Sequence, residues 1–290
     1  MRCFFHIGYN GFNYHGWQRQ SEYLSIQQVL EENLSKILKE PVTILGCGRT
    51  DAQVHAAQYF FHLDNKDKLG PDSYRDDLRF RLNKMLPADI AVFDIIPVAE
   101  NSHAQYDAKQ RTYDYFIHTY KDPFLNNVSS FYQENNLNLN KMKEAVSLLT
   151  KHTDYRAFCK SPDQYLPRGI NIQRGKHTNC NISSAKLLSD SKGEKLRFQI
   201  SSDRFLHGMI RAIVAKLLKV GSDEMSPEQF EEMLDFKTLN SKPKTLNQLE
   251  FAYPHGLYLS KVVYPFLDIS TRTEFSCIFQ NITEKEWITV

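Results

Sequence analysis

Asp51 is the residue of this sequence best placed to do chemistry. It lies in residues 48–56, between a β-branched run at residues 42–45 and an alternating apolar pattern at residues 59–63, so we expect it on a loop between two strands. A carboxylate held in this way can act as a nucleophile or as a proton acceptor. We expect Arg49 to keep it ionised through charge pairing and hydrogen bonding. For an isolated Arg-Thr-Asp, the simpler interpretation is a surface turn with an ordinary ion pair.

Arg211 is a second candidate because its neighbours at helical spacing are mostly small or apolar. They include Gly208, Val214 and Ala215. A buried guanidinium needs a carboxylate partner, since stranding its charge is costly, and we expect Asp51 to be that partner. The alternative is an arginine whose head group reaches solvent along the helix surface.

Several short strings of the sequence resemble the motifs of one enzyme family. They are residues 9–20 (YNGFNYHGWQRQ), 48–56 (GRTDAQVHA), 86–90 (LPADI), 108–113 (AKQRTY), 205–211 (FLHGMIR) and 256–259 (GLYL). In this order, over residues 2 to about 264, they resemble the TruA family of tRNA pseudouridine synthases. The resemblance implies an isomerase that converts uridine to pseudouridine in the anticodon stem-loop of tRNA. It also implies a homodimer that needs no cofactor and no metal.

The resemblance gives roles to individual residues. It makes Asp51 the nucleophile, Tyr113 the residue that stacks on the flipped uridine and moves a proton, and Leu257 the apolar residue that closes the pocket. Arg49 and Arg211 complete the predicted catalytic set. From their sequence context alone, Tyr113 fits a sheet-packing residue and Leu257 a core residue. The sequence leaves open whether Asp51 attacks C1′ of the ribose, attacks C6 of the base or only accepts a proton.

Four residues depart from the family pattern. Asn10 replaces an Asp, Gln53 a Gly, Gln105 an Arg and Ala215 a Gly. These changes keep two alternatives open, a paralogous synthase acting on another RNA and an RNA-binding module that has lost catalysis. At Gln53 we expect a right-handed backbone conformation, which would direct the side-chain amide toward the RNA. Retention of the catalytic set favours an active enzyme.

The overall charge is compatible with an RNA partner but does not indicate one. The 290 residues carry a net charge of +2, with a pI near 8.2. Residues 151–176 are locally basic and interleaved with aromatic side chains, the mixture that phosphate contact and base stacking require, although a solvated loop fits equally well. We expect Arg168 and Arg174 in this segment to contact tRNA phosphates.

Other classes of protein fit less well. Five scattered cysteines without a Cys-x-x-Cys pair, no signal peptide and no run long enough to cross a bilayer predict a cytoplasmic protein with reduced thiols. Gly11 and Gly16 have the spacing of a phosphate-binding loop, but Trp17 and the following Gln stand where Lys and Ser or Thr are required. His55 and His62 lack partners at metal-ligand spacing, so we expect polar histidines with satisfied hydrogen bonds.

The elements that must position these residues form two similar sets. The first is a strand at residues 3–9, a helix capped by Ser25 that ends before Pro41, and the two strands around Asp51. The second has a strand at residues 111–120, a helix capped by Asn140, strands at 182–188 and 196–201, helices at about 205–221 and after Ser226, and a strand at 257–263.

This pattern predicts an α+β protein. With the resemblance, it predicts two similar sheet-plus-helix domains, residues 1–105 and 106–267, sharing a continuous and mostly antiparallel sheet. The tail, residues 268–290, has no predicted role.

Overall fold

The computed structural model describes residues 2–63, 71–133, 137–160, 178–235, 249–269 and 288–289. By their internal contacts the residues form two compact units, unit 1 (Met1–Tyr113 and Pro254–Asn281) and unit 2 (Asp114–Tyr253 and Ile282–Val290). The division differs from the predicted one because the chain returns to unit 1 after Tyr253. Most of the predicted tail, residues 270–287, lies outside the described residues.

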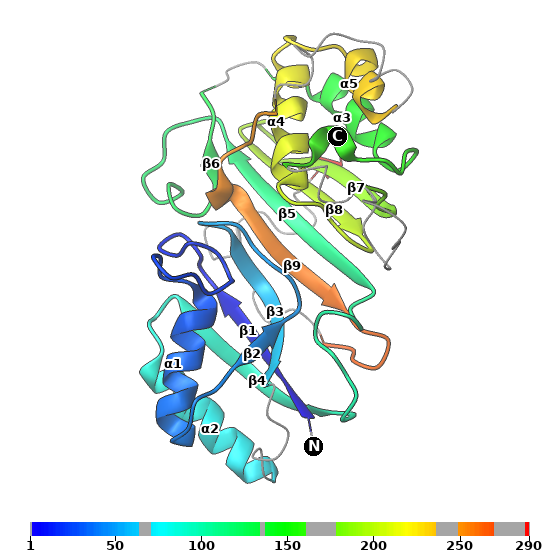
Figure 1. Cartoon of the computed structure of the whole chain (residues 1–290). Coiled ribbons are helices and arrows are strands. Elements are labelled where there is room, and N and C mark those ends of the chain that lie inside the picture. The colour runs from blue at the N-terminus through cyan, green and yellow to red at the C-terminus, as the bar shows by residue number, and fades with distance from the viewer. Residues whose placement is uncertain are drawn as a thin grey trace. The chain divides into compact units, whose positions relative to one another are not determined.

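Unit 1 is built on a mostly antiparallel sheet (Figure 1). Its strands are β1 (Arg2–Tyr9), β2 (Ile44–Gly46), β3 (His55–Leu63), β4 (Ile90–Val98) and β9 (Leu257–Val263). The order is β9-β3-β1-β4, with β2 also on β3, and only the β3–β9 pair is parallel. Pairing with β3 is what places β9, from the end of the sequence, in this unit.

Two helices, α1 (Ile26–Leu38) and α2 (Asp72–Met85), pack on each other, and α2 packs on β4 (Figure 1). The Ser25 side chain caps α1 by accepting a hydrogen bond from the backbone N–H of Gln28, as predicted. The sequence pattern did not indicate α2. Most of its residues are polar or charged, and Leu78 and Leu82 are its buried apolar side chains.

The centre of the unit 1 sheet is buried on both faces and mostly apolar. Every residue of β3 is buried, as is all of β1 except Arg2. Phe5 and Phe61 are register partners whose rings stack with centroids 4.6 Å apart. The loop that enters β3 therefore starts from a firmly packed strand.

Unit 2 repeats the arrangement of a sheet with helices. Its strands are β5 (Gln110–His118), which begins in unit 1, β6 (Ser130–Phe131), β7 (Ile182–Ser189), β8 (Lys195–Ser202) and β10 (Ile288–Thr289). The order is β10-β7-β8-β5, with β6 parallel to β5. The predicted hairpin of β7 and β8 is confirmed, and Gly193 in its turn has a φ of +73°.

The helices of unit 2 are α3 (Leu139–Leu148), α4 (Met209–Gly221) and α5 (Pro227–Leu234), and they pack on one another. The cap of α3 is Asn138, so the prediction of Asn140 was wrong. Helix α4 begins after Gly208, whose left-handed φ of +74° stops the helix from extending back to residue 205. The predicted capping box at Ser226 is confirmed, as is the α+β class.

Candidate active site

The loop that carries Asp51 is held in place by main-chain atoms. The backbone N–H of Trp17 donates to the carbonyl oxygen of Thr50 (3.2 Å), and that of Gln53 donates to the carbonyl oxygen of Tyr14 (2.9 Å). Gly16 lies so close that a Cβ atom on it would come within 2.3 Å of the Thr50 carbonyl oxygen. Residues 14–17 therefore brace the Asp51 loop from one side.

Buried side chains brace the same loop from the sheet. The Tyr9 hydroxyl and the Thr50 hydroxyl share a hydrogen bond of 2.9 Å. The Tyr59 hydroxyl donates to the carbonyl oxygen of Gly48 (2.5 Å), and its ring stacks on Trp17 with centroids 4.1 Å apart. Thr50 is buried against this aromatic core, whereas Asp51, the next residue, is half-buried and therefore partly accessible to solvent.

Tyr113 shares the surroundings of Asp51. Its side chain is buried, and burial raises the pKa of its hydroxyl above the ordinary value; the nearby Arg111 opposes this rise, while Cys47 and Asp51 add to it. Arg111 donates to the carbonyl oxygens of Cys47 (2.7 Å) and Gln105 (3.0 Å). The Asp51 carboxylate thus lies near enough to the Tyr113 hydroxyl to influence its protonation.

Leu257 begins β9 beside the strand that follows the Asp51 loop. The register pairs His55 with Tyr258, so buried Leu257 lies one residue further toward the loop. Of the predicted site residues, Asp51 and Tyr113 from the catalytic set and Leu257 from the substrate-binding set all belong to unit 1.

His55 is a satisfied histidine, as predicted. Its Nδ1 accepts a hydrogen bond from the backbone N–H of Gly11 (3.0 Å), and its Nε2 lies 3.0 Å from the carbonyl oxygen of His255. Burial lowers the pKa of His55 to about 4, so the ring is neutral at pH 7. His62 differs, because its Nδ1 accepts from Ala104 (3.3 Å) while its buried Nε2 has no partner among the described residues.

The prediction for the backbone of Gln53 was wrong. Its φ is +64°, in the left-handed region, and its backbone N–H donates a hydrogen bond to the carbonyl oxygen of Tyr14. A residue with a Cβ costs about 1 kcal/mol there, so the hydrogen bonds that brace the loop must offset that strain. The side-chain oxygen of Asn10 accepts a hydrogen bond from the backbone N–H of Phe12 (3.0 Å), and an aspartate at this position can accept the same bond.

The two predicted arginines differ in their surroundings. Arg49 is exposed and makes no ion pair within the part of the chain that the structure describes, so its expected pairing with Asp51 is not present. Arg211 lies on α4 in unit 2, where its Nε donates to the carbonyl oxygen of Ala252 (2.8 Å) and its guanidinium lies 5.5 Å from the centre of the Phe251 ring. A pairing of Arg211 with Asp51 would join the two units and stays a prediction. Arg168 and Arg174 lie outside the described residues.

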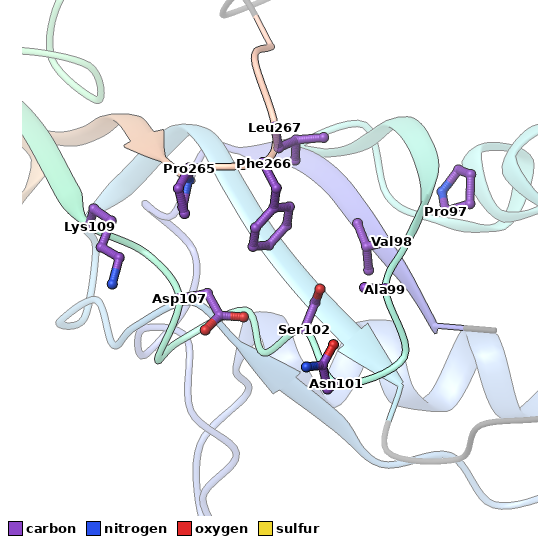
Figure 2. Close-up of a pocket in the computed structure, with 10 residues that line it drawn as sticks. All are labelled: Pro97, Val98, Ala99, Asn101, Ser102, Asp107, Lys109, Pro265, Phe266 and Leu267. Carbon is purple, nitrogen blue, oxygen red and sulfur yellow. The ribbon is translucent and has the colours of Figure 1, made fainter.

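A groove of about 660 Å³ opens at another part of unit 1 (Figure 2). Val98, which lines it, pairs with Arg2 at one end of β1, whereas Tyr9 at the other end pairs with Ala56, just after the Asp51 loop. Figure 2 shows the Phe266 ring pointing into this groove. Its lining includes neither Asp51 nor any other predicted site residue, so the groove is not the candidate active site.

Some contacts that build the site were missed by sequence reasoning. The strings compared with the family contain Thr50, Gly16 and Arg111, but only the structure joins Thr50 to Tyr9, Gly16 to the Asp51 loop and Arg111 to Cys47. Among the described residues, no group of three or more His, Cys, Asp or Glu side chains is placed to hold a metal ion. None of the described helices is long and apolar enough to span a membrane.

Comparison with known proteins gives a consistent result. A family described as tRNA pseudouridine synthase matches residues 145–265. The chain is 35% identical to tRNA pseudouridine synthase A of Porphyromonas gingivalis, over 91% of this chain and 97% of that protein. It is 36% identical to the protein of the same name from Parabacteroides distasonis, over 91% and 96% of the two chains. For Exiguobacterium sibiricum the identity is 33%, over 89% and 95%.

Proposed function

The chain belongs to the tRNA pseudouridine synthase A family and is an isomerase that forms pseudouridine in tRNA, and we propose that it acts on the anticodon stem-loop with Asp51 as the nucleophile. The observation that supports the proposal is the braced loop of unit 1, which fixes the backbone of Asp51; the charge of Asp51 also contributes to the raised pKa of the buried Tyr113 hydroxyl. The family resemblance of the residues around Asp51 supports the choice of the anticodon stem-loop.

The reaction needs little beyond a well-placed carboxylate. The bond between N1 of uracil and C1′ of ribose breaks, the base turns over, and a bond forms between C5 and C1′; the C5 proton leaves and N1 gains one, so the atoms balance. A carboxylate at Asp51 serves either as the atom that attacks or as the proton acceptor. The loop's attachment to a packed sheet supports this role, because a catalytic group must be held in one orientation to be effective.

Tyr113 would provide the surface for the detached base and handle its proton. A raised pKa keeps the hydroxyl protonated at neutral pH, so it is a hydrogen-bond donor and not a base. Tyr113→Phe keeps the ring and removes the hydroxyl. We expect unchanged tRNA affinity and a turnover rate about a hundredfold to ten-thousandfold lower in single-turnover assays, as for loss of a proton-transfer group. Wild-type turnover by this variant would restrict Tyr113 to stacking.

The remaining predicted residues fit supporting roles. Leu257, buried at the start of β9, would close the apolar side of the pocket over the base. The exposed guanidinium of Arg49 would contact the RNA itself. Arg211 would hold the Asp51 carboxylate, and Arg168 and Arg174 would bind phosphates. We also propose a homodimer in the cytoplasm, which sedimentation of the purified protein and cell fractionation test.

Two alternatives remain distinct from this proposal, a synthase acting on another RNA and an RNA-binding module without catalysis. Retention of Asp51, Tyr113 and Arg211 favours catalysis. The test is to map pseudouridines by carbodiimide treatment and primer extension in cells with and without this gene. Loss of pseudouridine from anticodon stem-loops supports the proposal. Loss from another RNA supports the paralogue, and an unchanged map supports the module that lacks catalysis.

A further inference from the structure

The loop before α1 is tied to the backbone of Asp51. A Cβ atom on Gly16 would lie 3.0 Å from the carbonyl carbon of Asp51, and the residues on either side of Gly16 belong to the same brace. His15 directly precedes Gly16, which puts its Cα within about 10 Å of the Cα of Asp51. The backbone of His15 is therefore held close to that of the candidate nucleophile.

The side chain of His15 forms a solvent-exposed aromatic stack with Tyr23. Its ring lies on the ring of Tyr23, with centroids 4.3 Å apart and an angle of 25° between the planes. His15 is exposed, and Tyr23 is 49% exposed. In contrast, Tyr9, Trp17 and Tyr59, the aromatic residues that brace the Asp51 loop, are buried.

Two hydrogen bonds hold this stack in shape. The backbone N–H of His15 donates to the carbonyl oxygen of Leu24 (2.9 Å), and the side-chain amide of Gln20 donates to the carbonyl oxygen of His15 (3.0 Å). They close residues 15–24 into a loop whose two ends meet at the stack. Aromatic surface that is ordered before binding loses little conformational freedom when a partner arrives.

We propose that His15 and Tyr23 form a stacking platform for a base of the tRNA next to the reacting uridine. The inference rests on the proposed function, because it takes Asp51 as the point of reaction. An RNA base is the occupant that fits, since every base has a flat face that stacks on aromatic side chains, and the family acts on RNA. A flipped uridine leaves its neighbours unstacked, and the platform is attached to the chain at His15, whose Cα lies within about 10 Å of the Asp51 Cα.

The test measures binding of a tRNA transcript that carries the fluorescent base 2-aminopurine beside the target uridine, using Asp51→Asn protein so that no product forms. Tyr23→Ala in this background should raise the Kd about five- to a hundredfold and remove the quenching of the probe. Tyr23→Phe keeps a flat ring and should stay within twofold of the parent with quenching intact. His15→Ala should act in the same direction as Tyr23→Ala.

Phe80→Ala is the matched control, because Phe80 is an aromatic residue of the same unit that is 59% exposed on α2. It should leave both Kd and quenching unchanged. If Tyr23→Ala also leaves them unchanged, the stack is only local packing and the proposal is wrong. If Phe80→Ala weakens binding as much, the effect is not specific to the platform and the proposal is also wrong. Failure of the proposed function is separate, since it appears as pseudouridine formation by Asp51→Asn itself.

Discussion

Asp51 in unit 1 and Arg211 in unit 2 are held by different kinds of contact. The Asp51 loop is fixed by backbone hydrogen bonds to residues 14–17 and by the hydroxyl groups of Tyr9 and Tyr59. Arg211 is fixed by its own side chain, which donates to Ala252 and lies over Phe251. A backbone bond from Ala252 N–H to the Arg211 carbonyl oxygen (3.0 Å) completes that contact.

The two residues therefore differ in whether the side chain can be replaced without disturbing the backbone around it. Because main-chain atoms hold the Asp51 loop, its side chain can be replaced while the loop stays in place. Because the Arg211 side chain itself ties residues 251–252 to α4, its replacement changes the local fold of unit 2 together with any role that Arg211 has in catalysis. Each expectation can be tested by substitution.

Among the substitutions that test this contrast, the largest effect is expected from Gly16→Ala. The new Cβ would meet the Thr50 carbonyl oxygen at 2.3 Å, and the φ of +83° adds about 1 kcal/mol of strain. The Asp51 loop must move, so turnover should fall at least about a hundredfold, because catalytic groups tolerate displacements of only about 1 Å. Turnover assays measure the loss of activity, and urea unfolding measures the loss of stability that the strain causes.

Gly193→Ala is the matched control. Its φ of +73° imposes similar strain, but the nearest atom to a Cβ, on Leu139, is 4.0 Å away. We expect a loss of stability of about 1 kcal/mol with wild-type turnover. Equal loss of turnover in both variants would show that strain alone matters and that contact with the Asp51 loop does not.

A second prediction concerns Arg211→Met. It removes the hydrogen bond to Ala252 and the charge over Phe251, and should destabilise the protein by about 1–3 kcal/mol. Arg211→Lys restores the charge without the same donor geometry and should fall between Met and wild type. Thermal unfolding measures the change. An unchanged melting temperature in Arg211→Met would remove the contrast with the Asp51 loop.

The pH dependence of stability provides a third prediction. The pKa of His55 is lowered to about 4 in the folded protein, because burial disfavours the charged ring, so the unfolded chain binds a proton first as the pH falls. The contribution of neutral His55 is fully present above about pH 6.5 and is lost as the pH approaches 4. Protonation would also remove the acceptor for Gly11 N–H, one of the contacts beside the Asp51 loop.

The free energy of unfolding should therefore fall between pH 6.5 and 4, by up to about 1.4 kcal/mol per pH unit for each such histidine. His55→Gln should reduce this slope. His62→Gln should reduce it by a comparable amount, because the pKa of His62 is also lowered to about 4, mainly by burial. A slope unchanged in His55→Gln would contradict the assignment of a neutral buried ring.

Local patterns predicted the elements with clear signals. Helix α1 follows from Ser25 and its apolar spacing, and the β7–β8 hairpin follows from two alternating runs around Gly193. Helix α2 was missed because charged residues obscure its short apolar face of Leu78 and Leu82. The place of β9 could not be predicted from a local pattern, because its pairing with β3 joins residues 203 positions apart.

The site was predicted in parts for the same reason. Motifs identified Asp51, Tyr113 and Leu257, but the braces on the loop come from Tyr9 and Gly16, distant in sequence. The left-handed backbone at Gln53 depends on such a contact, with Tyr14, and no local preference of Gln indicates it.

The most direct measurement of the central claim is single-turnover pseudouridine formation by Asp51→Asn. The substitution preserves shape, so tRNA affinity should stay within a few fold and thermal stability should be nearly unchanged, while turnover falls at least about a thousandfold. Asp76→Asn, on a side chain that is 74% exposed on α2 in the same unit, is the control and should retain wild-type turnover. Pseudouridine formation at the wild-type rate by Asp51→Asn would contradict the account.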